Sequence, residues 1–130
     1  MTGSGFRQAF TVLAGLALGL STLQFFLAGL GVFAGDSFSP HKVVGYALQL
    51  IALLILLSAV IGKLGRSGVI FGAGLLVIVV VMGIIAEQDN VIGALHPLLA
   101  VTFWFGSFQA FSWGRTGAPL VDSPATAHEH

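Results

Sequence analysis

The stretch that decides the fold, residues 39–63, reads SPHKVVGYALQLIALLILLSAVIGK. Its part from 43 to 62 holds about twenty residues without a charge, enough for an α-helix to cross roughly 30 Å of hydrocarbon. Ser39 is a candidate N-cap, and Pro40 suits the first helical position, where no N–H is needed. The stretch therefore predicts a transmembrane helix with His41 in its first turn.

The composition of the chain agrees with an integral membrane protein. Of 130 residues, 56% are apolar and only 8% are charged, which is typical of membrane proteins and not of soluble domains. The formal net charge is zero, so there is no basic surface of the kind that binds nucleic acid. Cysteine is absent, which excludes disulfides and thiolate metal sites. Any chemistry must come from His, Asp, Glu and Gln.

Three further apolar runs flank this stretch. The four predicted helices cover about residues 7–34, 40–62, 68–86 and 91–113. The fourth begins at Val91 or at His96, because Pro97 either starts the helix or kinks it. Short connections favour an antiparallel, up-down-up-down transmembrane bundle, all-α, in which the second and fourth helices are parallel and diagonal. Residues 1–113 form this domain, and the polar segment 114–130 is predicted to be a disordered cytoplasmic tail.

The basic residues predict the orientation in the membrane. Four of the five fall on one side of the predicted bundle: Arg7, Lys63, Arg66 and Arg115. Cytoplasmic connections are enriched in Lys and Arg, so we expect both termini to be cytoplasmic. The chain is then a multi-pass protein of the cell's inner (plasma) membrane, with the lipid bilayer as its first partner.

We estimate the depth of each polar side chain in the membrane by counting residues along its helix from these basic residues. By this count all four helices carry a polar side chain at nearly the same depth. His41 and His96 precede the basic ends of their helices by similar lengths, so their heights differ by roughly 4.5 Å. Glu87 reaches the same level, and Gln24 sits one turn deeper. We expect this layer at the outer edge of the membrane.

The residues beneath the two histidines predict a slot. One helical turn inward lie Gly45 below His41 and Ala100 below His96, both with small side chains. Farther inward, Leu48 and Phe103 continue the two faces as apolar walls. Two histidines on diagonal helices above such a slot suit a planar macrocycle whose iron takes one imidazole from each side.

The chain resembles the membrane-embedded b-type cytochromes, four-helix bundles that clamp haem between histidines on their helices. It is also similar to small bacterial four-span membrane proteins of uncharacterised function, through QFFLAG at 24–29, His41-x-x-x-Gly45-Tyr46 and Leu95-His96-Pro97. The resemblance implies a haem-binding or redox-linked membrane protein. Members that conduct electrons across the bilayer use four ligand histidines for two haems, whereas His128 and His130 here belong to the predicted tail.

One haem b near the outer face is therefore the leading hypothesis, with His41 and His96 as axial iron ligands. The other candidate cofactor-binding residues are Gly45, Ala100, Gln24 and Phe103. A single haem would exchange electrons laterally, with a quinone or a membrane redox partner. No catalytic residue is assigned.

Three alternatives stay open. His41 and His96, completed by Glu87, are a candidate two-histidine, one-carboxylate site for a small metal ion. His41 is also placed to hydrogen-bond lipid phosphate or its own loop. Finally, the chain is a candidate accessory or scaffold subunit that forms a homo-oligomer or a larger complex through the glycine pairs Gly15/Gly19 and Gly68/Gly72.

Overall fold

The computed structural model describes residues 3–88 and 90–117, and within them the secondary structure is helical throughout. The elements are α1 (Gly3–Gly29), the π-helical turn η1 (Leu30–Ala34), α2 (Ser39–Ile61), α3 (Gly65–Ile85), the 3-10 turn η2 (Gly93–Leu95) and α4 (His96–Thr116). No strand occurs among these residues. The prediction of an all-α chain with four helices is confirmed.

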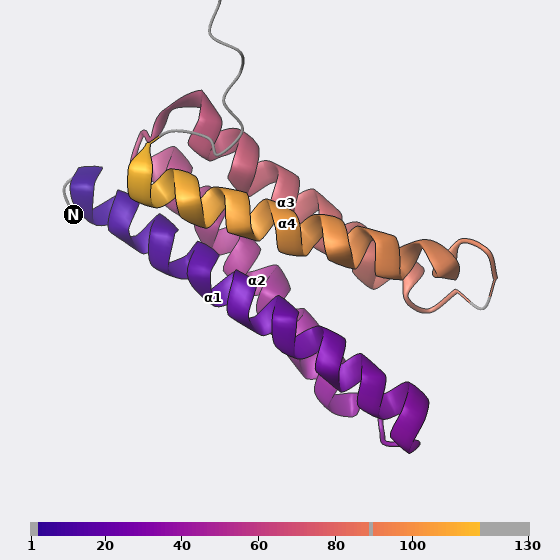
Figure 1. The fold of residues 1–130 in the computed structure, drawn as a ribbon. Helices are drawn as coiled ribbons and strands as arrows, with labels where there is room; N and C mark the ends of the chain where they lie inside the picture. The colour runs from indigo at the N-terminus through magenta and orange to yellow at the C-terminus, as the bar shows by residue number, and fades with distance from the viewer. Residues whose placement is uncertain (1–2, 89, 118–130) are drawn as a thin grey trace, which may run out of the picture.

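The four long helices form an antiparallel bundle (Figure 1). Helix α1 packs against α2 and α4, and α3 packs against the same two helices. The parallel helices α2 and α4 therefore lie on a diagonal, as the sequence predicts. Because both begin at the same end of the bundle, the first turns of α2 and α4 lie at one level.

The two ends of the bundle differ (Figure 1). At the closed end, the start of α1, the turn between α2 and α3 and the end of α4 lie together. At the open end, the α1–α2 pair diverges from the α3–α4 pair. The open end holds the connection between η1 and α2 and the connection between α3 and α4. Both histidines of the described chain lie there, one at the start of each parallel helix.

The bundle axis is lined mainly by small side chains at spacings of three and four residues. The buried positions are Phe10, Ala14, Ala17 and Ser21 on α1, Leu48, Ala52, Ile55, Ser58 and Ala59 on α2, Gly68, Gly72, Leu75, Val79 and Met82 on α3, and Phe103, Ser107, Ala110, Trp113 and Gly114 on α4. Alternating three- and four-residue steps are the repeat of left-handed helix packing. Many large aliphatic side chains point outward instead.

Three of the helical segments are long and apolar enough to cross a membrane: Gly3–Ala34, Ser39–Ile61 and Gly65–Ile85. Helix α4 does not reach the same hydropathy, although its 21 residues match the length of α3. Polar side chains on α4, Ser107 and Gln109 among them, lower its hydropathy, and the buried Ser107 hydroxyl donates to the Phe103 carbonyl one turn back (2.9 Å).

The structure decides two sequence-based boundaries at helix starts. Ser39 is the first residue of α2 and does not cap it; instead its N–H donates to the Ser37 hydroxyl (3.1 Å), which turns the chain into the helix. Of the two starts that the sequence allows for α4, the structure has the one at His96 and not the one at Val91, because Pro97 occupies the first turn and residues 91–95 lie before the helix.

A third boundary needs correction at the end of α4, which includes residues 114–116 that the sequence assigned to the tail. Arg7 holds this end: its Nε donates to the Gly114 carbonyl (3.0 Å) and its Nη2 to the Trp113 carbonyl (3.1 Å). The Trp113 carbonyl also accepts the Gly117 N–H (2.7 Å), so Arg7 adds a second donor there, whereas the Gly114 carbonyl is in the last turn, where intrahelical donors run out. The rest of the predicted tail, with His128 and His130, lies outside the described residues.

Most of the glycines proposed for assembly are already used inside the chain. A Cβ on Gly15 would meet the Phe111 ring at 3.2 Å, one on Gly68 would meet Trp113 at 3.1 Å, and one on Gly72 would meet the Leu56 backbone at 2.6 Å. Only Gly19 of the four has open space around it. Three of the four glycines thus pack within the bundle itself, which leaves Gly19 as the one of these positions with open space for a contact outside it.

Candidate functional site at the open end

His41 lies in the first turn of α2, half-buried against α1. Its Nδ1 is 3.3 Å from the main-chain carbonyl oxygen of Gln24. A carbonyl only accepts, so this hydrogen bond places the proton on Nδ1 and leaves Nε2 of the neutral ring with its lone pair. The Phe38 ring packs edge-on against the imidazole at 6.3 Å between centroids.

His96 is held in the same way at the start of α4. Its Nδ1 is 3.1 Å from the main-chain carbonyl oxygen of Met82 on α3. That carbonyl also accepts the helical N–H of Ala86 (3.0 Å), so it uses both lone pairs. The sequence indicated neither Met82 nor the carbonyl of Gln24, because a main-chain acceptor leaves no side-chain signature.

The two imidazoles lie next to each other across the bundle diagonal, with ring centroids 6.1 Å apart and ring planes tilted by 58°. Metal–nitrogen bonds of about 2 Å on both sides of one ion place two trans imidazole centroids roughly 6 Å apart. Among the described residues, neither Nε2 has a hydrogen-bond partner. The pair thus has the spacing of trans ligands and two free lone pairs.

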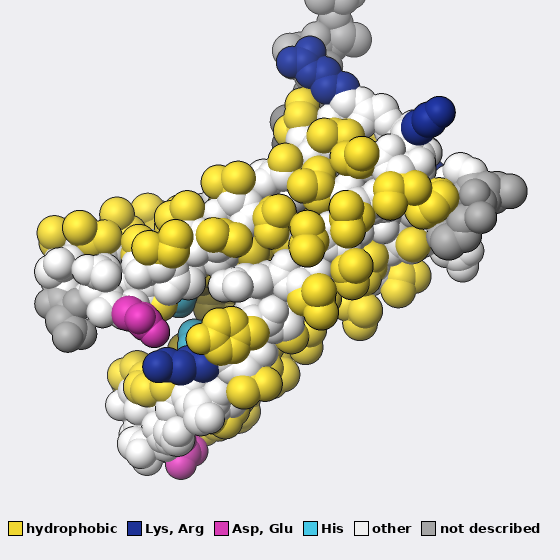
Figure 2. Space-filling view, turned by 180° about the vertical axis from the view of Figure 1, so that it is seen from behind, with side chains coloured by type: hydrophobic (Ala, Val, Ile, Leu, Met, Phe, Trp, Pro, Cys, Tyr) yellow, Lys and Arg dark blue, Asp and Glu magenta, His cyan; other side chains and the backbone are white. Residues whose placement is uncertain are grey.

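A cleft opens around this pair. Seen from behind in Figure 2, the two limbs of the bundle separate, and histidine side chains lie within the hollow between them. Lys or Arg and Asp or Glu side chains lie beside the hollow. The only histidines in the described part of the chain are His41 and His96, so the cleft gives access to this pair.

The slot predicted below His41 is partly filled. A Cβ on Gly45 would lie 3.4 Å from Nε2 of Gln24, so the Gln24 amide occupies the space beside this glycine. The Oε1 atom of Gln24 is buried and has no hydrogen-bond partner. The space beside Gly45 is therefore bordered by a polar side chain, and a Cβ there would only just touch it.

The floor of the site is apolar and closed. Leu48 and Phe103 are each 1% exposed and belong to the core, and Ala100 packs against this core from α4. The walls predicted from Leu48 and Phe103 are thus a floor that separates the cleft from the rest of the bundle axis. Any ligand of the two histidines must sit in the cleft and not below it.

Glu87 does not join the histidines. It is exposed in the turn after α3, and residues 3–88 and 90–117 contain no group of three His, Cys, Asp or Glu side chains placed to hold a metal ion. The two-histidine, one-carboxylate site is therefore not formed in this structure. What the open end offers is a pair of imidazoles above an apolar floor.

Fold and site together define a small all-helical protein with three candidate membrane-spanning helices and a histidine pair in a cleft at one end. The chain belongs to a family of unknown function, DUF6220, whose model matches residues 24–88. The match includes Gln24, His41 and Met82, but it ends before His96. No curated protein and no solved structure matches the chain.

The Gln24 amide offers a direct test of the site's polarity. We expect Gln24→Met to raise the free energy of unfolding by about 1 kcal/mol, because it removes a buried acceptor that has no partner. Gln24→Glu should lower it, because it buries a charge at the same place. The His41 contact is to the Gln24 main chain and persists in both variants. Thermal unfolding in detergent measures both changes. A Gln24→Met variant that is less stable than the wild type would contradict the absence of a hydrogen-bond partner for Oε1.

Proposed function

We propose that this chain is a membrane protein that holds one haem b at its open end, with His41 and His96 as the two axial ligands. The observation that supports this most directly is that both imidazole rings are held in the same way. Each Nδ1 bonds a main-chain carbonyl, and each Nε2 is left free. Metal-ligating histidines are typically oriented through their other ring nitrogen in this way.

The residues around the pair suit such a group. The ring separation of 6.1 Å agrees with two imidazoles on opposite sides of one iron. Leu48 and Phe103 close the site from below and exclude water from that side. Gln24, with its buried and unpartnered Oε1, is a polar group within the wall of the site. When bound, a haem b supplies a one-electron couple whose potential depends on ligands and burial.

We further propose that all four helices span a bacterial inner membrane, with the closed end on the cytoplasmic side. Three helices meet the length and hydropathy of spans, and α4 lies among them with a matching length. Arg7, Lys63, Arg66 and Arg115 all lie at or next to the closed end, which is the distribution expected of a cytoplasmic side. The site then faces the outer leaflet.

This placement restricts how electrons leave the site. The described residues offer a single histidine pair, His41 and His96, and an apolar floor lies beneath it. Exchange along the plane of the membrane, with a quinone or a membrane redox partner, is the route that these residues allow. Transfer across the whole bilayer would require a second site deeper in the bundle.

An absorption spectrum of the detergent-purified protein tests the proposal. The protein is expressed with haem supplied, so that an empty site is not mistaken for the absence of a site. We expect a red preparation whose α and β bands sharpen on reduction with dithionite, as for a low-spin bis-histidine haem. A pure, folded and colourless protein with no haem by mass spectrometry would refute the proposal.

A further inference from the structure

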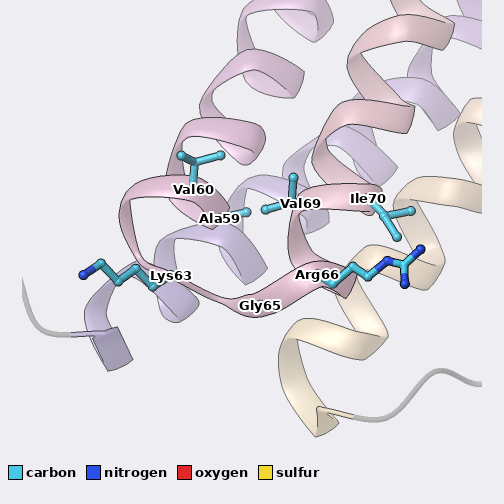
Figure 3. A pocket seen from close by; sticks show the side chains of 7 residues that line it. All are labelled: Ala59, Val60, Lys63, Gly65, Arg66, Val69 and Ile70. Atoms are coloured by element: carbon cyan, nitrogen blue, oxygen red, sulfur yellow. The ribbon is translucent and has the colours of Figure 1, made fainter.

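A second hollow lies at the opposite end of the molecule, between α2 and α3. It has a volume of about 420 Å³ and an apolar wall with a basic rim (Figure 3). Its lining residues are Ala59, Val60, Lys63, Gly65, Arg66, Val69 and Ile70. We call it the basic groove. In Figure 3 Ala59 and Val69 point toward each other between the two helices, and Val60 lies beside them on α2. Lys63 and Arg66 extend in opposite directions from the two sides of the groove.

The two cations of this groove differ from the other basic residues nearby. Arg7 donates to two carbonyls at the end of α4 and lies over the Trp113 ring, 5.3 Å from its centroid. Arg115 lies over the Phe111 ring at 5.6 Å. Among the described residues, Lys63 and Arg66 have neither an ion pair, nor a hydrogen bond from their side chains, nor an aromatic partner. Both are exposed, and both border the same groove.

No carboxylate of the described chain is available to neutralise them. The acidic residues within 3–88 and 90–117 are Asp36 and Glu87, and both lie at the open end. Two unpaired cations next to an apolar groove are complementary to an amphiphilic anion. Basic pockets between transmembrane helices on the cytoplasmic side are known to bind anionic lipid headgroups.

We propose that the basic groove binds an anionic phospholipid. The headgroup phosphate lies at the mouth of the groove, within reach of Lys63 and Arg66 once their flexible side chains turn toward it, and one acyl chain runs along Val60 and Val69. The long side chains of Lys63 and Arg66 reach the headgroup while their stems cover apolar surface. The proposal depends on insertion of the chain in a membrane and not on haem, so the two proposals succeed or fail separately.

Native mass spectrometry tests the charge requirement. The detergent-purified protein is mixed with equal amounts of phosphatidylglycerol and phosphatidylcholine that carry the same acyl chains, and the retained lipid is identified by mass. We expect the wild-type chain to retain phosphatidylglycerol preferentially. The preference should fall about fivefold for each basic side chain removed, in Lys63→Asn and Arg66→Gln. Asn is chosen at position 63 because the backbone there has a φ of 50°, which Asn tolerates.

Two control variants separate site binding from general charge. Arg115→Gln removes a cation from the same end of the chain but outside the groove, and it should leave the preference unchanged. The double variant Lys63→Arg with Arg66→Lys keeps both charges and should also keep the preference for phosphatidylglycerol. Equal losses in Arg115→Gln and Arg66→Gln, or a wild-type chain that retains both lipids alike, would overturn the proposal.

A third variant distinguishes a lipid from free phosphate. Val60→Phe adds bulk to the exposed apolar wall while both cations remain. We expect this variant to lose retained phosphatidylglycerol, and we expect millimolar inorganic phosphate not to displace the lipid from the wild-type chain. Displacement by phosphate, together with unchanged lipid retention in Val60→Phe, would show a simple anion site and contradict the acyl-chain contact.

Discussion

His96→Ala and His41→Ala each yield a colourless protein when expressed with haem. Either substitution leaves one imidazole where the proposed site needs two, and we expect the haem affinity to fall by at least about 100-fold. The fold should survive in both variants. The carbonyls of Gln24 and Met82 lie within helices, so the loss of an imidazole donor does not leave them without a partner. Haem content per protein and the reduced spectrum measure the loss.

Two further variants test the role of the histidines themselves. His96→Met offers the iron a thioether, and we expect it to retain haem with a raised reduction potential, as for a Met/His ligand pair. Glu87→Gln removes the carboxylate of the alternative metal site and should leave the spectrum unchanged. Haem that is retained in both alanine variants, or lost in Glu87→Gln, would contradict the proposed ligands.

Much of this site follows from the order of the residues alone. Helix lengths and short connections predict that α2 and α4 run parallel, and the positions of His41 and His96 near the starts of these helices predict that they meet. The structure brings them to 6.1 Å. What the spacing does not predict is how each ring is held, because Nδ1 in both cases bonds the main chain of a neighbouring helix. A main-chain acceptor is present in every residue, so the amino-acid sequence does not indicate which carbonyl accepts the hydrogen bond.

The inward faces of the helices were also hard to predict, and for a physical reason. In a soluble helix the buried stripe is apolar and the rest is polar, whereas here the outward side chains are apolar too. The usable signal is size: Ala14, Ala17 and Ser21 mark the axis by their spacing of three and four residues. For the same reason the sequence predicts empty space at Gly45, although the Gln24 amide lies beside it.

The second large effect is expected at the contact between α2 and α3 near the closed end. A Cβ on Gly72 would lie 2.6 Å from Cα and 3.0 Å from N of Leu56. These are backbone atoms, so no rotamer change relieves the overlap, and the two helices must move apart. We expect Gly72→Ala to lower the free energy of unfolding by about 1–3 kcal/mol, and a larger residue at this position to prevent folding.

Gly74, two residues along the same helix, provides the matched comparison. No heavy atom lies within 4 Å of its added Cβ, so Gly74→Ala should be neutral or should stabilise the helix by up to about 1 kcal/mol. Thermal or denaturant unfolding in detergent measures both variants. Equal effects at the two positions would mean that α2 and α3 do not approach this closely. The closed end would then not be the tight contact from which the two helix pairs diverge toward the histidine cleft.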